Sequence, residues 1–379
     1  MQTQEQKDLI KNAIEQAKLN GILKYLPNGE LTHAPFSLSP YAMPESFFEK
    51  MAELTVPFNE LMIKVSRNTD FLIHHLEPIA AIDPFLKMLL KCRSKEISQN
   101  CQLLIQRNDF FIANVKHNDY KQNTTPTNEI TEESVLRQVE LNTVSASFPF
   151  LITRLYQLHK NLFEQNKLPK VIQNNPLDVV VDALAHSVQN YGISDSVILV
   201  VVQSNEKNIF DQIGLQQHLW IKHNIATVRK TLVEIHKDGK LRQGHLVVDG
   251  KTVALTYFRA GYTPDDFPEE LAFKGRQLIE ASSTIQVPDM GMQLSGMKKI
   301  QQVLTKKEVL ADFVTEEISR RFLKTFAKMH TLDEIINTPE GEVSASEWLS
   351  YHADDYVLKP QREGGGNNYF GSDILKLVP

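Results

Sequence analysis

The stretch Val197–Val202, "VILVVV", decides the fold, because it is an unbroken run of β-branched residues and leucine. Such a run is typical of a strand that is buried on both faces of a parallel sheet. A polar turn, "QSNEKN", and a segment with helical spacing, "IFDQIGLQQHLWIKH", follow it directly. A strand, a turn and a helix in this order form one unit of an α/β sheet. We therefore predict an α/β protein.

The neighbouring segments extend this sheet. Before it, Leu177–Val188 ("LDVVVDALAHSV") has the composition and spacing of a helix. After it, His245–Tyr262 ("HLVVDGKTVALTYFRAGY") predicts a hairpin, because Asp249-Gly250 tolerates the positive φ angles of a tight turn. Phe267–Glu280 predicts a further helix. The middle of the chain is therefore expected to hold a compact α/β lobe.

The first part of the chain is expected to be mainly helical. In Leu9–Leu19 and in parts of Pro44–Val65, apolar residues recur at spacings of three and four. Cys101–Val115 predicts a strand and a turn, and the polar Lys121–Glu133 predicts a surface loop. Ser134–Asn142 ("SVLRQVELN") predicts a second strand, whose residues alternate between two faces.

These patterns indicate three segments along the chain. Residues 1–195 would form the first part of a main domain, and residues 196–300 a smaller domain inserted into it. Residues 301–379 would return to the main domain, since helical patterns resume from Lys298. There the segment "DDYVLKP" predicts a strand that leads into a glycine-rich loop.

Composition excludes several classes of protein. The 379 residues are 42% hydrophobic and 23% charged, which is typical of a soluble globular protein. The formal net charge of -5 gives no electrostatic basis for binding nucleic acid or an anionic membrane. The polar start, "MQTQEQKDLIKN", lacks the apolar core of a signal peptide. Cys92 and Cys101 form neither a disulfide framework nor a CxxC pair, so we expect a cytoplasmic protein.

The glycine-rich stretch Val357–Gly371, "VLKPQREGGGNNYFG", is the first candidate site. Three glycines let backbone N–H groups approach an anion without a Cβ atom in the way. Lys359 can neutralise phosphate, and Glu363 can hold the Mg²⁺ that accompanies it. The stretch is not a Walker P-loop, because no Lys-Ser/Thr follows the glycines. A surface turn between solvated charges is the ordinary alternative for a bare triple glycine.

The segment "VELNTVSASF" is the second candidate. Residues two apart in a strand share a face, so Glu140 and Asn142 would present two oxygen ligands side by side. Mg²⁺ prefers a few oxygen ligands together with phosphate and water, and this pair could supply them. Ser145 and Ser147 could then donate hydrogen bonds to a substrate. Taken alone, a polar strand edge that faces solvent is the more ordinary interpretation.

Three further segments carry polar residues at helix or strand ends. Asn208 and Gln212 are four apart at the start of a helix and would point the same way, unless Asn208 only caps that helix. Arg259 ends a strand, where its guanidinium could bind a carboxylate, and Tyr262 follows it closely. Lys298 could reach phosphate. A surface arginine and a solvated lysine pair are the ordinary alternatives.

Together, these segments resemble a known family. "VELNTVSASF", "EKNIFDQ", "YFRAGY", "SGMKKIQQ" and "LKPQREGGGNN" are similar, in this order, to the signature segments of eukaryotic-type glutathione synthetases. The resemblance implies an ATP-grasp-like fold with an inserted substrate-binding lobe. It also implies a homodimer that uses ATP and Mg²⁺ to join glycine to γ-glutamylcysteine.

The resemblance assigns roles by motif. The implied Mg²⁺ ligands are Glu140, Asn142 and Glu363. The implied phosphate contacts are Lys298, Lys359, Gly364 and Gly365, which together with Ser147 would form the catalytic set. Further contacts to the nucleotide would come from Val357, Asn368 and Phe370. The implied dipeptide contacts are Arg107, Ser145, Ser147, Glu206, Asn208, Gln212, Arg259 and Tyr262.

The assigned dipeptide set suits its ligand, because γ-glutamylcysteine carries two carboxylates and an ammonium group. The chain departs from the family at Phe370, where a tyrosine is usual, and family members continue well past Pro379. We therefore expect a chain that lacks the C-terminal part, and whose own activity is open. The leading hypothesis is an ATP-dependent peptide ligase that forms an acyl phosphate. A non-catalytic family member that binds the dipeptide or dimerises is the alternative.

Overall fold

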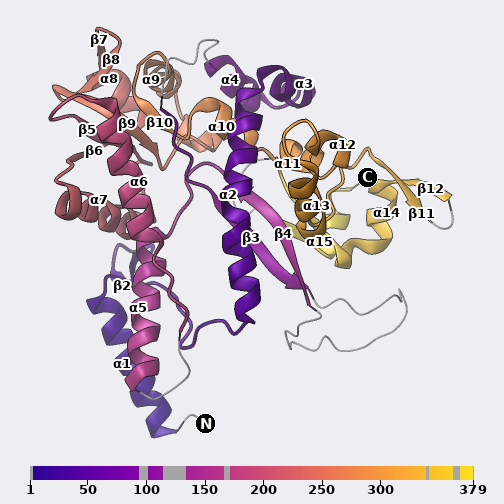
Figure 1. The fold of residues 1–379 in the computed structure, drawn as a ribbon, viewed down its shortest axis with the longest axis horizontal. Helices are drawn as coiled ribbons and strands as arrows, with labels where there is room; N and C mark the ends of the chain where they lie inside the picture. The colour runs from indigo at the N-terminus through magenta and orange to yellow at the C-terminus, as the bar shows by residue number, and fades with distance from the viewer. Residues whose placement is uncertain are drawn as a thin grey trace. The chain divides into compact units, whose positions relative to one another are not determined.

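The computed structural model describes residues 3–93, 101–113, 134–165, 171–338, 341–361 and 368–378 (Figure 1). The chain forms two compact units, each from three segments of sequence. Unit 1 comprises Met1–Ala42, Ser94–Ile105 and Ser145–Asp289. Unit 2 comprises Met43–Arg93, Gln106–Val144 and Met290–Pro379. These breaks between compact units differ from the expected limits at residues 195 and 300. The expected division into a main domain and an inserted substrate-binding domain stays a prediction.

A six-stranded sheet forms the centre of unit 1. β5 (Val197–Val201) is completely buried and pairs in parallel with β6 (Thr227–Lys230) and with β9 (Lys251–Phe258). β10 (Ile285–Val287) is also parallel to β9, whereas β8 (His245–Val248) is antiparallel to it. The strand predicted from "VILVVV" is thus confirmed. The expected parallel sheet is in fact mixed, because the hairpin adds β8 and then β7 (Lys240–Arg242) in antiparallel pairing.

Two apolar cores explain why β5 shows no alternation of polar and apolar residues. Ile198 and Val200 pack in the core with α6 (Pro176–Tyr191) and α7 (Ile209–His223). Val197, Leu199 and Val201 pack in the other core, whose remaining members include Leu232 and Ile279. Both faces of the strand are therefore covered by helices.

The remaining elements of unit 1 complete these layers. They are α1 (Gln4–Leu19), β1 (Leu23–Tyr25), β2 (Leu31–His33), α5 (Pro149–Gln165), α8 (Leu232–Asp238), the 3₁₀ turn η1 (Pro264–Asp266) and α9 (Glu270–Glu280). In the β8–β9 hairpin, Asp249 and Gly250 have φ angles of 52° and 78°. Both values lie in the left-handed region that a tight hairpin turn requires, which confirms that prediction.

Unit 2 combines helices with short sheets. Its helices are α2 (Glu45–Arg67), α3 (Thr69–Ala80), α4 (Pro84–Cys92), α10 (Met290–Ser295), α11 (Lys298–Leu304), α12 (Lys307–Leu310), α13 (Glu316–Thr325), α14 (Ala345–His352), the 3₁₀ turn η2 (Ala353–Asp355) and α15 (Ser372–Leu375). Its strands are β3 (Arg107–Ala113), β4 (Val135–Asn142), β11 (Ile335–Thr338), β12 (Gly341–Ser344), β13 (Val357–Leu358) and β14 (Tyr369–Phe370). No helix in the described ranges is long and apolar enough to cross a membrane.

β4 carries its polar residues toward the interior of unit 2. Gln138, Glu140 and Asn142 have exposed fractions of 5%, 9% and 5%. The alternation of two faces is present, but the interpretation as a solvent-facing polar edge is wrong. A buried carboxylate and a buried amide need partners, because an unpaired polar group in the interior is costly. These partners define the first candidate site.

Candidate functional site

The first site is a cluster of two lysines around one buried carboxylate, which we call the lysine–glutamate cluster. The Lys298 Nζ atom lies 3.4 Å from Glu140 Oε1, and the Lys359 Nζ atom lies 3.2 Å from Glu140 Oε2. Lys359 Nζ also donates to the Val139 carbonyl at 3.2 Å. Lys298 is only 6% exposed, so the interpretation as a solvated lysine pair is wrong for this residue.

Electrostatics keep Glu140 ionised. Burial raises the pKa of Glu140, but the ammonium groups of Lys298 and Lys359 together lower it more, so the pKa lies below its ordinary value. Two cations thus face one anion in a partly desolvated place. Such a cluster is suited to accept a further anion, such as phosphate, because interactions between charges strengthen away from bulk water.

Glutamine side chains hold the elements of this cluster together. Gln301 on α11 accepts from the Leu141 N–H at 2.9 Å and donates to the Leu141 carbonyl at 3.0 Å. Gln361 Oε1 accepts from the Lys299 N–H at 2.9 Å, which ties the start of α11 to the residues after β13. A Cβ atom at Gly296 would lie 2.2 Å from Thr143 Oγ1, so only glycine permits this approach to the end of β4.

Asn142 is oriented by an aspartate that the sequence reasoning missed. Asn142 Nδ2 donates to Asp109 Oδ2 at 3.1 Å. Arg107 donates to the same carboxylate through Nε at 2.7 Å and Nη2 at 2.9 Å. Because the amide nitrogen of Asn142 is engaged, its carbonyl oxygen is the atom left to bind a metal. The segment "IQRNDFF" contained this signal, since Arg107 and Asp109 share a strand face.

The expected metal ligands are only partly placed. Glu140 and Asn142 lie two residues apart on the same face of β4, as predicted. Carboxylate and amide oxygens are donors that Mg²⁺ accepts, so this pair fits the metal. Glu363, with Gly364 and Gly365, lies outside the described residues. Within the described ranges, no three His, Cys, Asp or Glu side chains form a metal cluster.

The two strands that flank the glycine-rich loop bring the expected nucleotide contacts together. Val357 on β13 pairs with Phe370 on β14, and their exposed fractions are 39% and 62%. Two exposed apolar side chains on neighbouring strands offer a flat surface to an aromatic base. Asn368 is half-buried just before β14.

The second site lies in unit 1 around Arg259. Arg259 is 3% exposed, so the interpretation as a surface arginine is wrong. Nη1 donates to the Ala146 carbonyl and Nη2 to Ser147 Oγ, both at 2.6 Å. Among the described residues, its Nε atom has no hydrogen-bond partner. Its nearest acid is Asp211, with 4.0 Å between Nη2 and Oδ2.

Asp211 fixes the serine-containing turn. Its carboxylate accepts from the N–H groups of Phe148, Phe150 and Leu151 at 2.9, 3.0 and 3.2 Å, which caps the start of α5. Ser145 and Phe148 have φ angles of 51° and 80°, a strained conformation that these contacts stabilise. Burial raises the pKa of Asp211, and Arg259 and the three N–H groups only partly offset this.

The start of α7 supplies further polar groups. Gln212 is 3% exposed, and its Oε1 accepts from Arg229 Nη2 at 2.9 Å. Glu206 Oε1 accepts from the Asn208 N–H at 2.8 Å. The Asn208 side chain makes no capping hydrogen bond, so the capping alternative is wrong. Arg229, on β6, was not identified from the sequence, where nothing marks it out from a surface residue.

The backbone around Tyr262 is held by a carboxylate. Asp266 Oδ2 accepts from the N–H groups of Gly261, Tyr262 and Thr263 at 2.8, 3.0 and 3.2 Å. Gln203 Nε2 donates to Asp266 Oδ1 at 2.8 Å and lies 3.5 Å from the Tyr262 hydroxyl. Burial, followed by Asp266, raises the pKa of Tyr262. Its hydroxyl is therefore a hydrogen-bond donor at neutral pH.

The structure therefore groups the expected dipeptide contacts unequally. The members in unit 1 are Ser145, Ser147, Glu206, Asn208, Gln212, Arg259 and Tyr262. Arg107 belongs to unit 2, where it forks onto Asp109.

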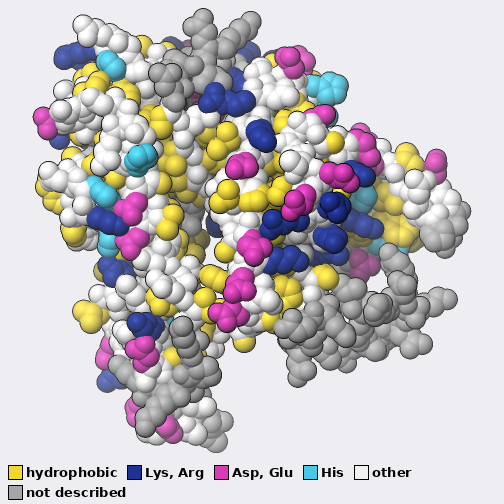
Figure 2. All heavy atoms as spheres, viewed as in Figure 1, with side chains coloured by type: hydrophobic (Ala, Val, Ile, Leu, Met, Phe, Trp, Pro, Cys, Tyr) yellow, Lys and Arg dark blue, Asp and Glu magenta, His cyan; other side chains and the backbone are white. Residues whose placement is uncertain are grey.

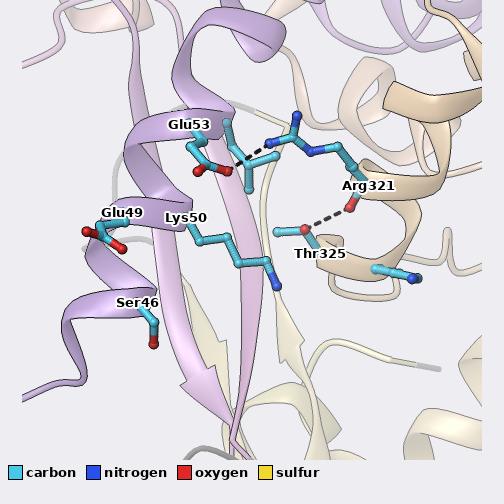
Figure 3. Close-up of a pocket in the computed structure, with 8 residues that line it drawn as sticks. Ser46, Glu49, Lys50, Glu53, Arg321 and Thr325 are labelled. Atoms are coloured by element: carbon cyan, nitrogen blue, oxygen red, sulfur yellow. Dashed lines mark hydrogen bonds and ion pairs between the residues drawn. The ribbon is translucent and has the colours of Figure 1, made fainter.

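A separate pocket of about 310 Å³ lies between α2 and α13 of unit 2 (Figure 3). Its lining residues are Ser46, Glu49, Lys50, Glu53, Leu54, Arg321, Lys324 and Thr325. Figure 3 shows Arg321 directed at Glu53, and the Nη2–Oε2 distance is 3.3 Å. On the face in Figure 2, Lys and Arg side chains gather around the region of α13, with acidic side chains among them. These charges are exposed and screened by solvent, so the pocket is a weaker candidate.

Comparison with known proteins gives a consistent result. A family model described as eukaryotic glutathione synthase, ATP binding domain, matches residues 3–378. The chain is 36% identical to the chloroplastic glutathione synthetase of Solanum lycopersicum, over 92% of this chain and 62% of that protein. It is 33% identical to glutathione synthetase of Dictyostelium discoideum, over 97% of this chain and 76% of that protein. It is 31% identical to glutathione synthetase of Homo sapiens, over 99% of this chain and 78% of that protein.

The chain thus spans about three fifths of the length of the plant relatives that it matches. A glutathione synthetase-like effector from Globodera pallida, solved in its apo form, superposes with a TM-score of 0.75. The match covers 99% of this chain and 78% of that chain at 20% sequence identity, and it confirms the fold.

Proposed function

Because the chain belongs to the eukaryotic glutathione synthase family, we propose that it takes part in the ATP-dependent ligation of γ-glutamylcysteine with glycine. The observation that carries this proposal is the lysine–glutamate cluster, in which the buried Lys298 and the half-buried Lys359 contact one carboxylate. Phosphate oxygens would take over part of this pairing when ATP binds. Val357, Asn368 and Phe370 would contact the rest of the nucleotide.

We assign the metal site to Glu140, Asn142 and Glu363. Bound Mg²⁺ would neutralise charge on the phosphates during transfer. Asp109 supports this assignment, since it holds the Asn142 amide with its oxygen available. Arg107 shares Asp109, so a contact from Arg107 to the dipeptide would compete with this ion pair.

The unit 1 residues are proposed to bind the dipeptide. Glu206 would accept from the ammonium group, and Arg259 would bind a carboxylate. The amides of Asn208 and Gln212 and the hydroxyls of Ser145, Ser147 and Tyr262 would supply the remaining hydrogen bonds. Glu206 Oε2 and Gln212 Nε2 support this assignment, because both atoms are buried and lack partners among the described residues.

The proposed reaction has two steps. The terminal phosphoryl group of ATP passes to an oxygen of the cysteinyl carboxylate, which gives an acyl phosphate and ADP. The glycine amine then attacks the carbonyl carbon, phosphate leaves with the bonding electron pair, and the nitrogen loses a proton. Lys298, Lys359, the backbone of Gly364 and Gly365, and Ser147 would position the groups and stabilise charge, so no side-chain nucleophile is required.

We also propose a cytoplasmic homodimer, since the resemblance to the family implies a dimer and the cysteine usage a reducing compartment. Cys92 and Cys101 are free thiols, which suits a reducing compartment. Sedimentation of the purified chain over a range of concentrations would measure its state of association.

ATP binding tests the proposed function. The Lys298→Met variant should bind ATP about 10- to 100-fold more weakly in a calorimetric titration, because it loses a charge-assisted hydrogen bond. Lys299→Met is the matched control, since Lys299 Nζ donates to Gln302 and not to Glu140. No measurable ATP binding by the unaltered chain would contradict the proposal, as would equal effects of both variants.

A further inference from the structure

Arg229 is a half-buried arginine whose guanidinium is incompletely paired. It lies on β6, opposite Val200 of β5. Nη2 donates to Gln212 Oε1 at 2.9 Å. Nη1 is buried and makes no hydrogen bond to any residue that the structure describes. A buried donor without an acceptor is costly and calls for an explanation.

Another arginine in unit 1, Arg276, also has buried nitrogens without a hydrogen-bond partner among the described residues, but a carboxylate matches its charge. Arg276 is completely buried, and its Nη2 and Nε atoms lie 2.7 and 2.9 Å from Glu280 Oε1. It also lies over the Phe258 ring, 3.8 Å from the ring centroid. Arg229 has neither a carboxylate fork nor an aromatic ring within the described part of unit 1. A carboxylate of a ligand would supply the pairing that Arg276 has and Arg229 lacks.

Arg229 lies beside the other incompletely paired groups of the site. Burial lowers the pKa of Arg229, the Glu206 carboxylate raises it, and the Arg259 guanidinium lowers it. Both charged groups are therefore close enough to act on Arg229. Glu206 Oε2, Gln212 Nε2 and Arg259 Nε are further buried atoms of this site that lack a hydrogen-bond partner among the described residues. Three donors and one carboxylate oxygen of this site therefore lack hydrogen-bond partners among the described residues.

This combination fits the head group of an amino acid. The α-ammonium and α-carboxylate of the γ-glutamyl moiety share one carbon atom, so their partners in the protein must also be neighbours. Glu206 can accept from the ammonium while a neighbouring guanidinium holds the carboxylate. The cysteinyl carboxylate is the group to be phosphorylated, so it should not be locked in such a pair.

We propose that Arg229 binds the γ-glutamyl α-carboxylate and is a further specificity-determining residue of the unit 1 site. The inference rests on the proposed function, because it takes γ-glutamylcysteine as the ligand. Arg229 thereby selects dipeptides whose first residue carries a free α-carboxylate.

The test compares two dipeptides by calorimetric titration. 4-Aminobutyrylcysteine keeps the amine and the cysteinyl carboxylate of γ-glutamylcysteine but lacks the α-carboxylate. The unaltered chain should bind γ-glutamylcysteine about 10- to 100-fold more tightly than this analogue. Arg229→Lys and Arg229→Gln should lose most of this preference and leave the affinities for the analogue and for ATP unchanged.

Lys230→Met is the matched control, because Lys230 is the next residue of β6 and pairs with Asp238 and Asp249. Thermal unfolding checks that each variant is folded. If Arg229→Gln does not fold, the dipeptide preference of Arg229→Lys alone tests the inference. A retained preference in Arg229→Lys would overturn the inference alone, as would an equal loss of affinity for both dipeptides. If the unaltered chain bound neither dipeptide, the proposed function would fail and the inference with it.

Discussion

At the scale of single residues, Glu140 has two opposed effects on phosphate binding. Without metal, its carboxylate competes with phosphate for Lys298 and Lys359. With Mg²⁺, the same carboxylate would become a ligand and favour phosphate. Glu140 should therefore couple nucleotide binding to the metal.

The Glu140→Gln variant tests this coupling. Mg²⁺ should tighten ATP binding to the unaltered chain, and this gain should shrink about 10-fold or more in the variant. ATP affinity without metal should stay equal or increase, since both lysines are released. Titrations with and without Mg²⁺ give both values, and the exposed Glu342→Gln serves as control. An unchanged response to Mg²⁺ would remove Glu140 from the metal site.

Glu140 also makes stability depend on pH. Burial raises its pKa and the two lysines lower it more, so the native pKa lies below the ordinary value of 4.5. The stabilisation is then fully present above about pH 4.5 and is lost as the pH falls through the native pKa. In urea unfolding, the free-energy difference between the unaltered chain and Glu140→Gln should be constant above about pH 5 and decrease below 4.5. A free-energy difference that grows on acidification would contradict the lowered pKa of Glu140.

At the scale of elements, Asp211 joins α7 to the start of α5. Three N–H groups depend on its carboxylate, and it is 2% exposed. Asp211→Ala should therefore lower the free energy of unfolding by about 3 kcal/mol, because the buried donors lose their acceptor. Asp211→Asn should cost less, since its amide oxygen can still accept.

Urea unfolding measures this loss, and Asp182→Ala is the comparison at the surface. Asp182 joins α6 to α7 through Lys222 and His223, but its side chain is half exposed. Its removal should matter much less, because exposed ion pairs contribute little. Equal losses of unfolding free energy from the two alanine variants would show that Asp211 does not hold α7 and the start of α5 together.

The elements also show what the sequence could and could not predict. β5 and the β8–β9 hairpin were predicted correctly, because an unbroken apolar run and an Asp-Gly turn are local signals. For β4, the sequence taken alone favoured a polar edge that faces solvent, which was wrong, since alternation reveals two faces but not which one is covered. Asp211 and Gln301 were missed as organising residues because their partners lie 60 and 160 positions away in sequence. Glu363, Gly364 and Gly365 stay predictions.

At the scale of the whole molecule, the two units differ in how their cores are assembled. All buried members of both sheet cores of unit 1 fall within residues 145–289. In unit 2, by contrast, α2 packs against α10, and Phe58 stacks on Phe322 with 4.2 Å between ring centroids. The core of unit 2 therefore joins distant parts of the chain.

Fragments of the chain should behave accordingly. A fragment of residues 145–289 should be folded, with a cooperative urea transition followed by circular dichroism. A fragment of residues 1–144 should not unfold cooperatively, since α2 lacks α10 and α13. A non-cooperative transition for residues 145–289 would show that the sheet cores depend on other segments.

The packing of α2 against α10 and α13 has a consequence for synthesis on the ribosome. α2 emerges early, but its partners follow only after residue 289 has been added. At about 5–20 residues per second, translation of residues 94–289 takes about 10–40 s. Throughout that time the apolar side of α2, including Phe58, has none of its later helical partners, while the sheet of unit 1 can already form. Nascent chains of this protein should therefore present the apolar side of α2 to cellular chaperones until α10 and α13 have been added.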